Sequence, residues 1–202
     1  AEAIVVSDYG RRLVEHPELR AALQRGGAHV PLVWDPHPRG ADPVPTARLV
    51  TPNIDEAADA AGTGHGAVRT EDAAARLRER YGCAAVLVTL GELGAVLHER
   101  GRAAVEITTE PVEAADPCGA GDRLASAVAV ALARGASLET AAREAVAVTR
   151  FYLAAGGVAS LPGIEASERG EIRTPESRGG EPLLASAALP RDPVELARSV
   201  HA

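Results

Sequence analysis

Short apolar runs alternate with helical segments along the chain, and this alternation constrains the fold more than any other feature of the sequence. Strands are expected at residues 3–7, 29–34, 47–50 and 84–91, with a hairpin over 94–107. Helices are expected at residues 16–27, 70–82 (with Thr70 as its cap), 120–134 and 137–155, and from Asn53 onward. Strands that alternate with helices form a mainly parallel sheet with helices on both faces. The sequence therefore predicts an α/β fold, a three-layer αβα sandwich.

Composition and charge exclude several classes of function. The net charge of −7 opposes a nucleic-acid partner, and the longest apolar runs are too short for a membrane span. The two cysteines, Cys83 and Cys118, lack the spacing of a zinc site. Every cation is arginine, so a phosphate clamp must use arginine or backbone. We expect a cytoplasmic protein.

A polar cluster follows each predicted strand. The clusters read SDYG, DPHPRG, TPNIDE, TLGELG and, after the hairpin, DPCGAGD. Ligands of open α/β sheets bind beyond the carboxyl ends of the strands. The sequence therefore predicts a ligand site at this edge of the sheet.

The segment Gly119-Ala120-Gly121-Asp122 opens the helix expected at 120–134. Its small residues let backbone N–H groups approach an anion, and the start of the helix adds a positive dipole end. Asp122 could take a proton from an alcohol that attacks a phosphoryl group. The alternative is an ordinary helix start, in which the negative charge of Asp122 only interacts favourably with the positive end of the helix dipole.

Asn53 and Glu56 lie three residues apart, on one face of a helical turn. Such a pair could order the water shell of Mg²⁺. The alternative is a capping box, in which each side chain binds the other residue's backbone N–H.

Thr89, Gly91 and Gly94 lie at the end of the strand expected at 84–91. Glycines there would let the phosphates of a nucleotide lie against the backbone. The alternative is a tight hairpin, whose glycines supply a positive φ.

Asp8 and Arg39 are candidate substrate residues, because they follow the first two strands. Asp8 could accept sugar hydroxyls, and Arg39 could bind phosphate through two parallel hydrogen bonds. The alternatives are a helix cap for Asp8 and a solvated loop for Arg39.

The order Asn-x-x-Glu, Thr-x-Gly-x-x-Gly and Gly-Ala-Gly-Asp resembles the ribokinase-like (PfkB) carbohydrate kinase family, over about residues 3–162. The resemblance implies a ribokinase-like fold that binds ATP, Mg²⁺ and a sugar or sugar phosphate. It implies a catalytic base at Asp122, and it implies an anion hole at Gly119, Ala120 and Gly121. The other implied roles are a magnesium and phosphate region at Asn53 and Glu56, nucleotide contacts at Thr89, Gly91 and Gly94, and a K⁺-type site at Asp116, Gly157 and Ser160.

The segments VVSDYG and WDPHPRG resemble, more narrowly, the kinase half of bifunctional heptose-phosphate kinase/nucleotidyltransferases. This resemblance implies a substrate like heptose 7-phosphate. DPHPR is also similar to the D-x-N-x-R of ketodeoxygluconate- and fructokinase-like members. Pro117 and Cys118 stand where the family usually has hydroxyl residues, and Arg11 and His37 stand where it has lysines.

Three segments are expected along the chain. Residues 1–162 resemble the C-terminal portion of the kinase domain, without the family's N-terminal portion and lid. Residues 163–190 show no periodic pattern of apolar residues, which predicts a flexible linker. Residues 191–202 are predicted to form a short helical tail that could lead to a second domain. The alternative to a kinase is a non-catalytic or split subunit that binds nucleotide or a partner chain. It would form a homodimer or pair with a missing N-terminal half through its bare edge strand.

Overall fold

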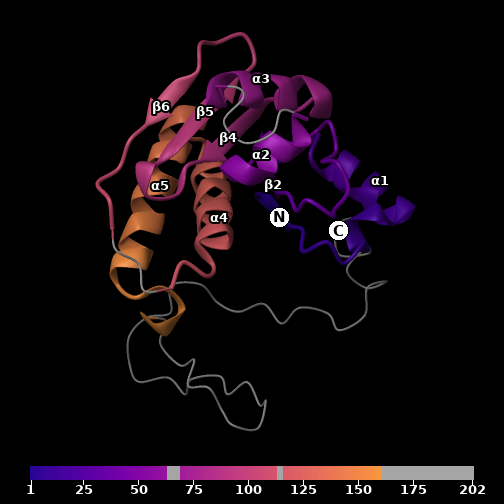
Figure 1. Cartoon of the computed structure of the whole chain (residues 1–202). Coiled ribbons are helices and arrows are strands. Elements are labelled where there is room, and N and C mark those ends of the chain that lie inside the picture. The colour runs from indigo at the N-terminus through magenta and orange to yellow at the C-terminus, as the bar shows by residue number, and fades with distance from the viewer. Residues whose placement is uncertain (63–68, 113–115, 161–202) are drawn as a thin grey trace, which may run out of the picture. The chain divides into compact units, whose positions relative to one another are not determined.

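A single mixed sheet forms the centre of the protein, whose computed structural model describes residues 1–62, 69–112 and 116–160 (Figure 1). Within these ranges its strands are β1 (Ile4–Ser7), β2 (Leu32–Asp35), β3 (Leu49–Val50), β4 (Ala85–Thr89), β5 (Ala95–Glu99) and β6 (Val105–Ile107). They pair in the order β1-β2-β3-β4-β5-β6. The first four run parallel, and β5 and β6 are antiparallel to their neighbours. The mainly parallel sheet predicted from the sequence is confirmed.

Five α-helices lie in the described ranges: α1 (Pro17–Gly26), α2 (Ile54–Ala60), α3 (Thr70–Tyr81), α4 (Ala120–Ala133) and α5 (Leu138–Ala154). Three short 3-10 helices accompany them: η1 (Leu13–Glu15), η2 (Gly91–Leu93) and η3 (Gly157–Ser160). The helices and strands predicted within the described ranges all occur, with bounds that differ by a few residues. The hairpin expected over 94–107 is the β5–β6 pair.

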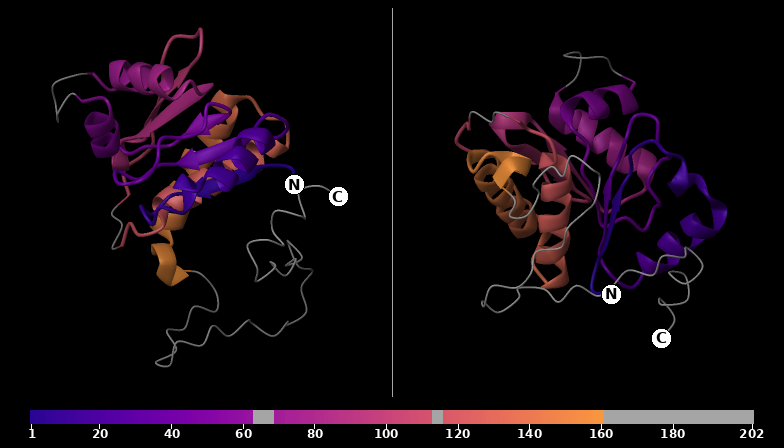
Figure 2. Two further views of the ribbon diagram at one scale, coloured as in Figure 1. Left: turned by 90° about the vertical axis from the view of Figure 1, so that its right-hand side faces the viewer. Right: turned by 90° about the horizontal axis from the view of Figure 1, so that it is seen from below.

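Helices cover both faces of the sheet, which gives the three layers (Figure 2). Successive side chains of a strand point to opposite faces. In β4, Leu87 packs into the apolar cluster with α4 and α5, and Val88 packs into the cluster with α2 and α3. Both faces are therefore buried, which explains why the β4 sequence is continuously apolar.

Small side chains bring α4 and α5 together and hold α4 against the sheet. Ala125 and Val128 of α4 and Ala141 and Ala142 of α5 are fully buried in one cluster. Burying one aliphatic side chain the size of valine contributes roughly 1.5–3 kcal/mol. This packing fixes the start of α4 relative to the strand ends.

Residues Ala1–Gly157 form one compact unit. The segments expected at 163–190 and 191–202 lie outside the described residues. No helix in the described ranges has the length and apolar character needed to cross a lipid bilayer.

Candidate active site

Four loops and one helix start meet at the carboxyl ends of the parallel strands. Tyr9 follows β1, Asp35 ends β2, Asn53 follows β3, and Thr89 ends β4. Asp122 lies in the first turn of α4. The structure therefore places the polar clusters at the sheet edge where the sequence predicted a ligand site.

Asp122 is held by a residue that lies 113 positions earlier in the chain. The Tyr9 hydroxyl donates a hydrogen bond of 2.7 Å to Oδ2 of Asp122. This bond and the carboxylate's charge raise the pKa of the Tyr9 phenol above its ordinary value. Tyr9 lies within the SDYG cluster, but no local pattern of residues indicates this contact.

The backbone turn before Asp122 leaves N–H groups available for an anion. Gly119 is the N-cap of α4, with a left-handed φ of 78°. The Ala120 N–H already donates to the Pro117 carbonyl at 3.1 Å, and the first helical bond runs from Arg123 to Gly119. The N–H groups of Gly119, Gly121 and Asp122 have no acceptor among the described residues. These three N–H groups, rather than that of Ala120, are open to a ligand.

Asp35 stands close to the same turn. A methyl group on Gly121 would lie 3.3 Å from Oδ2 of Asp35, and Thr51 donates a hydrogen bond of 3.0 Å to Oδ1. Burial raises the pKa of Asp35 to about 7, against the opposing effect of the Thr51 bond, and the charges of Glu56 and Asp122 add to the rise. The charges of two other carboxyl groups thus act on Asp35 here.

Asn53 and Glu56 form the capping box that the sequence left as an alternative. The Asn53 side chain accepts from the Glu56 N–H, and the Glu56 side chain accepts from the Asn53 N–H, both at 2.9 Å. Burial raises the pKa of Glu56, while its bond to the Asn53 backbone opposes that rise. The box uses Glu56 Oε2.

Thr89, Gly91 and Gly94 lie beside this helix start. Thr89 forms a β-bridge with Asn53, and its N–H donates to the Pro52 carbonyl at 3.0 Å. Gly91 begins η2 and Gly94 follows it, with positive φ values of 62° and 103°. The structure therefore brings the three residues together, and the glycines also serve the tight β4–β5 connection.

A hollow of about 700 Å³ is lined by Gly10, Arg11, Arg39 and Tyr9, the residue that binds Asp122. The guanidinium groups of both arginines are without a hydrogen bond or ion pair in the part of the chain that the structure describes. Arg11 and Arg39 are therefore free to bind an anion.

The Asp8 carboxylate is buried, with 8% of the residue exposed. Its Oδ1 accepts from the Gly10 N–H at 2.8 Å, and its Oδ2 has no partner among the described residues. Its predicted contact with sugar hydroxyls stays a prediction. The helix-cap alternative does not hold, because α1 begins at Pro17 with His16 as its N-cap.

Two of the three residues expected at a K⁺-type site lie together. A methyl group on Gly157 would lie 2.7 Å from the backbone carbonyl oxygen of Asp116. The Asp116 side chain accepts from the Cys118 N–H at 2.9 Å. The Ser160 side chain lies outside the described part of the structure.

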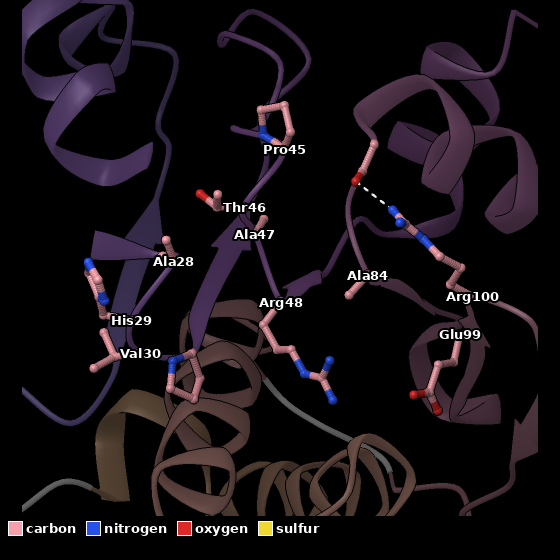
Figure 3. Close-up of a pocket in the computed structure, with 13 residues that line it drawn as sticks. Ala28, His29, Val30, Pro45, Thr46, Ala47, Arg48, Ala84, Glu99 and Arg100 are labelled. Carbon is pink, nitrogen blue, oxygen red and sulfur yellow. Dashed lines mark hydrogen bonds between the residues drawn. The ribbon is translucent and has the colours of Figure 1, made fainter. Parts of the chain in front are cut away.

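A second hollow, of about 610 Å³, lies at the opposite end of the strands, before β2, β3 and β4 (Figure 3). Arg100 lines it and donates to the Gly82 carbonyl at 2.8 Å, which the dashed line marks. The hollow contains none of the predicted site residues. It lies away from Asp122, so we assign it no part in the site.

Residues 16–163 match the model of the pfkB family of carbohydrate kinases. The chain belongs to this family. It is 42% identical over its whole length to the bifunctional protein HldE of Streptomyces coelicolor, and it spans 40% of that protein. It is 38% identical, over 85% of its length, to bifunctional protein HldE of a Caulobacter species, and it spans 34% of that protein.

Solved structures share the fold. Ribokinase from Thermotoga maritima superposes with a TM-score of 0.61 at 23% identity, covering 79% of this chain and 53% of the ribokinase. Arabidopsis thaliana ribokinase complexed with ribose and ATP gives a TM-score of 0.61 at 24% identity, covering 80% of this chain and 53% of that one. The ribokinase-like fold expected from the sequence is confirmed.

Proposed function

We propose that this chain carries the phosphoryl-transfer site of an ATP-dependent sugar kinase, with Asp122 as the general base. One observation carries the proposal: Asp122 and open N–H groups stand at the start of α4, and Tyr9, which binds Asp122, lines a hollow with two unpaired arginines. Family membership supports the same reaction.

Each residue of the site has its own role in phosphoryl transfer. Asp122 takes the proton from a sugar hydroxyl as the hydroxyl oxygen attacks the γ-phosphorus of ATP. The bond from the γ-phosphorus to the β-phosphate oxygen breaks, and ADP leaves. The N–H groups of Gly121 and Asp122, at the positive end of α4, stabilise the charge on the phosphoryl oxygens.

The nucleotide would approach from the β3 and β4 side, over Thr89, Gly91 and Gly94. The backbone around these residues is already ordered by the Asn53–Thr89 bridge. Loops at the carboxyl ends of parallel strands commonly hold nucleotides in α/β folds. ATP is therefore proposed as the phosphoryl donor.

The acidic residues of the site suit a magnesium ion. Asp35 and Glu56 are half-buried carboxyl groups whose pKa values are raised by burial, and each carries oxygen donors. Oxygen ligands and retained waters are what Mg²⁺ prefers. Asp35 and Glu56 would hold the ion, which would neutralise phosphate charge when bound. For K⁺ we propose the Asp116 and Gly157 region.

The substrate is proposed to be a sugar phosphate, like heptose 7-phosphate. Arg11 and Arg39 support this choice, because guanidinium groups bind phosphate through two parallel hydrogen bonds. The resemblance of SDYG and DPHPRG to heptose-phosphate kinases supports the same class. Fructose carries no anionic group for these arginines to bind, whereas ketodeoxygluconate has a carboxylate, which a guanidinium also binds.

The test is ADP release by the native protein with heptose 7-phosphate, fructose or ketodeoxygluconate, alongside Asp122→Asn. We expect activity with the sugar phosphate and a loss of about 10²- to 10⁴-fold in the variant, the usual contribution of a general base. Glu139→Gln serves as the control, because it removes a surface carboxylate paired with Arg143 at the start of α5. Equal rates for Asp122→Asn and the native protein would overturn the assignment of the base.

A second candidate function is supported by the edge of the sheet. β1 is an edge strand, and Val5 within it is 40% exposed. Unpaired strand edges associate with other strands. The chain would then act as a binding subunit that pairs with a second chain, with or without catalysis.

A further inference from the structure

We propose that Tyr9 is a positioning residue for Asp122: its hydroxyl binds Oδ2 and leaves Oδ1 to receive the proton of the acceptor sugar. The inference rests on the proposed function, in which Asp122 is the base. Its structural basis is the 2.7 Å bond from the Tyr9 hydroxyl to Oδ2.

The bond is short, and it joins a neutral donor to a charged acceptor. Hydrogen bonds of this kind are stronger than neutral ones and fix the acceptor's orientation. No other side-chain hydrogen bond to Asp122 occurs among the described residues. Tyr9 is therefore the side chain that sets the rotation of this carboxylate.

The loop that carries Tyr9 is held in place by contacts around the buried Asp8. Asp8 is 8% exposed, and its Oδ1 accepts from the Gly10 N–H at 2.8 Å, which closes the turn around Tyr9. Gly40 packs so closely on the other side of Asp8 that a methyl group there would overlap Oδ2. His37 lies against Gly10, and its Nδ1 accepts from the Arg39 N–H at 3.1 Å. The phenol is therefore presented from a fixed turn.

Whether the turn is fixed decides between two roles of the Tyr9 hydroxyl. A phenol on a loosely held loop would occupy the place of the sugar hydroxyl and be displaced when the substrate binds. A phenol on a fixed turn keeps its bond to Oδ2 throughout the reaction. Asp8 then acts by holding this turn.

The chemistry requires only one carboxylate oxygen. Oδ1 accepts the proton of the sugar hydroxyl as that oxygen bonds to the γ-phosphorus and the bond to the ADP oxygen breaks. Tyr9 keeps its own proton, so no further donor or acceptor is needed. Tyr9 lines the hollow together with Arg11 and Arg39, which places the substrate beside the same residue.

The kinetic test compares Tyr9→Phe with the native protein. Because Tyr9 is 59% exposed, the loss of one hydroxyl leaves the fold intact. We expect kcat to fall about ten- to a hundredfold, the effect of losing a hydrogen bond to a charged group, with KM unchanged for both substrates. Tyr81→Phe, in α3, is the matched control and keeps the native kcat. A lower KM with an unchanged kcat would overturn the proposal, because the hydroxyl would then only compete with the substrate.

A second measurement does not depend on activity. The chain has three tyrosines, so the spectroscopic titration of Tyr9 is obtained as the difference between the native protein and Tyr9→Phe. The carboxylate of Asp122 raises the pKa of Tyr9, so in Asp122→Asn this titration moves to lower pH. An identical Tyr9 titration in Asp122→Asn and the native protein would overturn the contact.

The two proposals fail in different ways. If Asp122→Asn stays active, the assignment of the base fails. If Asp122→Asn loses activity while Tyr9→Phe keeps the native kcat, the base stands and only the role of Tyr9 fails.

Discussion

Asp35 lies directly beside Gly121, so that a methyl group on Gly121 would be 3.3 Å from Oδ2 of Asp35. This relationship joins the end of β2 to the first turn of α4, which also carries Asp122. Burial chiefly raises the pKa of Asp35, and the charges of Glu56 and Asp122 raise it further, so three acidic groups share one edge of the sheet. Such a cluster is stabilised by protons or by a bound cation. Its protonation should therefore be visible in the stability of the protein.

The first prediction concerns Asp35 and pH. Its pKa is about 7 in the folded protein, against an ordinary value of 3.8 that applies to the unfolded chain. The folded state therefore binds more protons than the unfolded state between roughly pH 4 and pH 7. The free energy of unfolding should fall as pH rises through this interval and level off above it. Asp35→Asn cannot ionise and should remove much of this decrease. Urea unfolding of both proteins at about pH 5 and about pH 8 measures the effect.

The matched control for this experiment is Asp59→Asn, an exposed carboxylate at the end of α2. It should leave the pH dependence of the unfolding free energy as it is in the native protein. If Asp35→Asn shows the same decrease as Asp59→Asn, Asp35 does not titrate in this range.

The second prediction separates the two roles considered for Asn53 and Glu56. Asn53→Ala removes the cap of α2 and should lower the unfolding free energy by about 1 kcal/mol. Glu56→Gln keeps an acceptor for the Asn53 N–H, so stability should change little. If Glu56 also holds Mg²⁺, this variant should need more magnesium for half-maximal kinase activity. An unchanged magnesium requirement would restrict Glu56 to the capping box.

The third prediction compares Gly94 with Gly91. A side chain on Gly94 would overlap the Ile107 carbonyl oxygen, whereas Gly91 has open space around it. Gly91→Ala should cost only about 1–2 kcal/mol for its left-handed φ. Gly94→Ala should cost about 1–3 kcal/mol more, because the β5–β6 backbone must shift. Thermal unfolding of both variants measures the difference.

The kinetics of these variants provide the functional half of the comparison. Gly91→Ala should raise KM for ATP if the glycine lies against the nucleotide. Equal losses of stability in the two variants would contradict the contact between Gly94 and β6.

The sequence predicted the fold well where the pattern is local. β4 is a continuous apolar run buried on both faces, and its bounds were predicted closely. The predicted strand at 47–50 was less accurate. The Ala47 N–H donates a hydrogen bond to the Val44 carbonyl in a turn, so β3 consists only of Leu49–Val50. The predicted cap at Thr70 was wrong: Arg69 is the N-cap of α3, without a side-chain hydrogen bond. One or two neighbouring residues decide such details.

The site was predictable only in part, because several of its contacts join distant segments. The order of the motifs indicated which loops gather at the sheet edge. The bond between Tyr9 and Asp122 spans 113 positions, and the packing of Gly40 on Asp8 joins two different loops. These contacts depend on how β1, β2 and α4 pack, and no residue pattern within one loop encodes them.

The last prediction concerns the bare edge of β1. If a second chain pairs with this edge, the protein should have a molar mass above the 20.8 kDa of one chain in size-exclusion chromatography with light scattering. Val5→Lys places a charge on the 40%-exposed position of the edge strand and should shift the mass toward that of one chain. Phe151→Lys changes a 66%-exposed position on α5 and should leave the mass unaltered. A native protein that is already monomeric would contradict self-association through β1, and equal effects of both lysines would place the interface elsewhere.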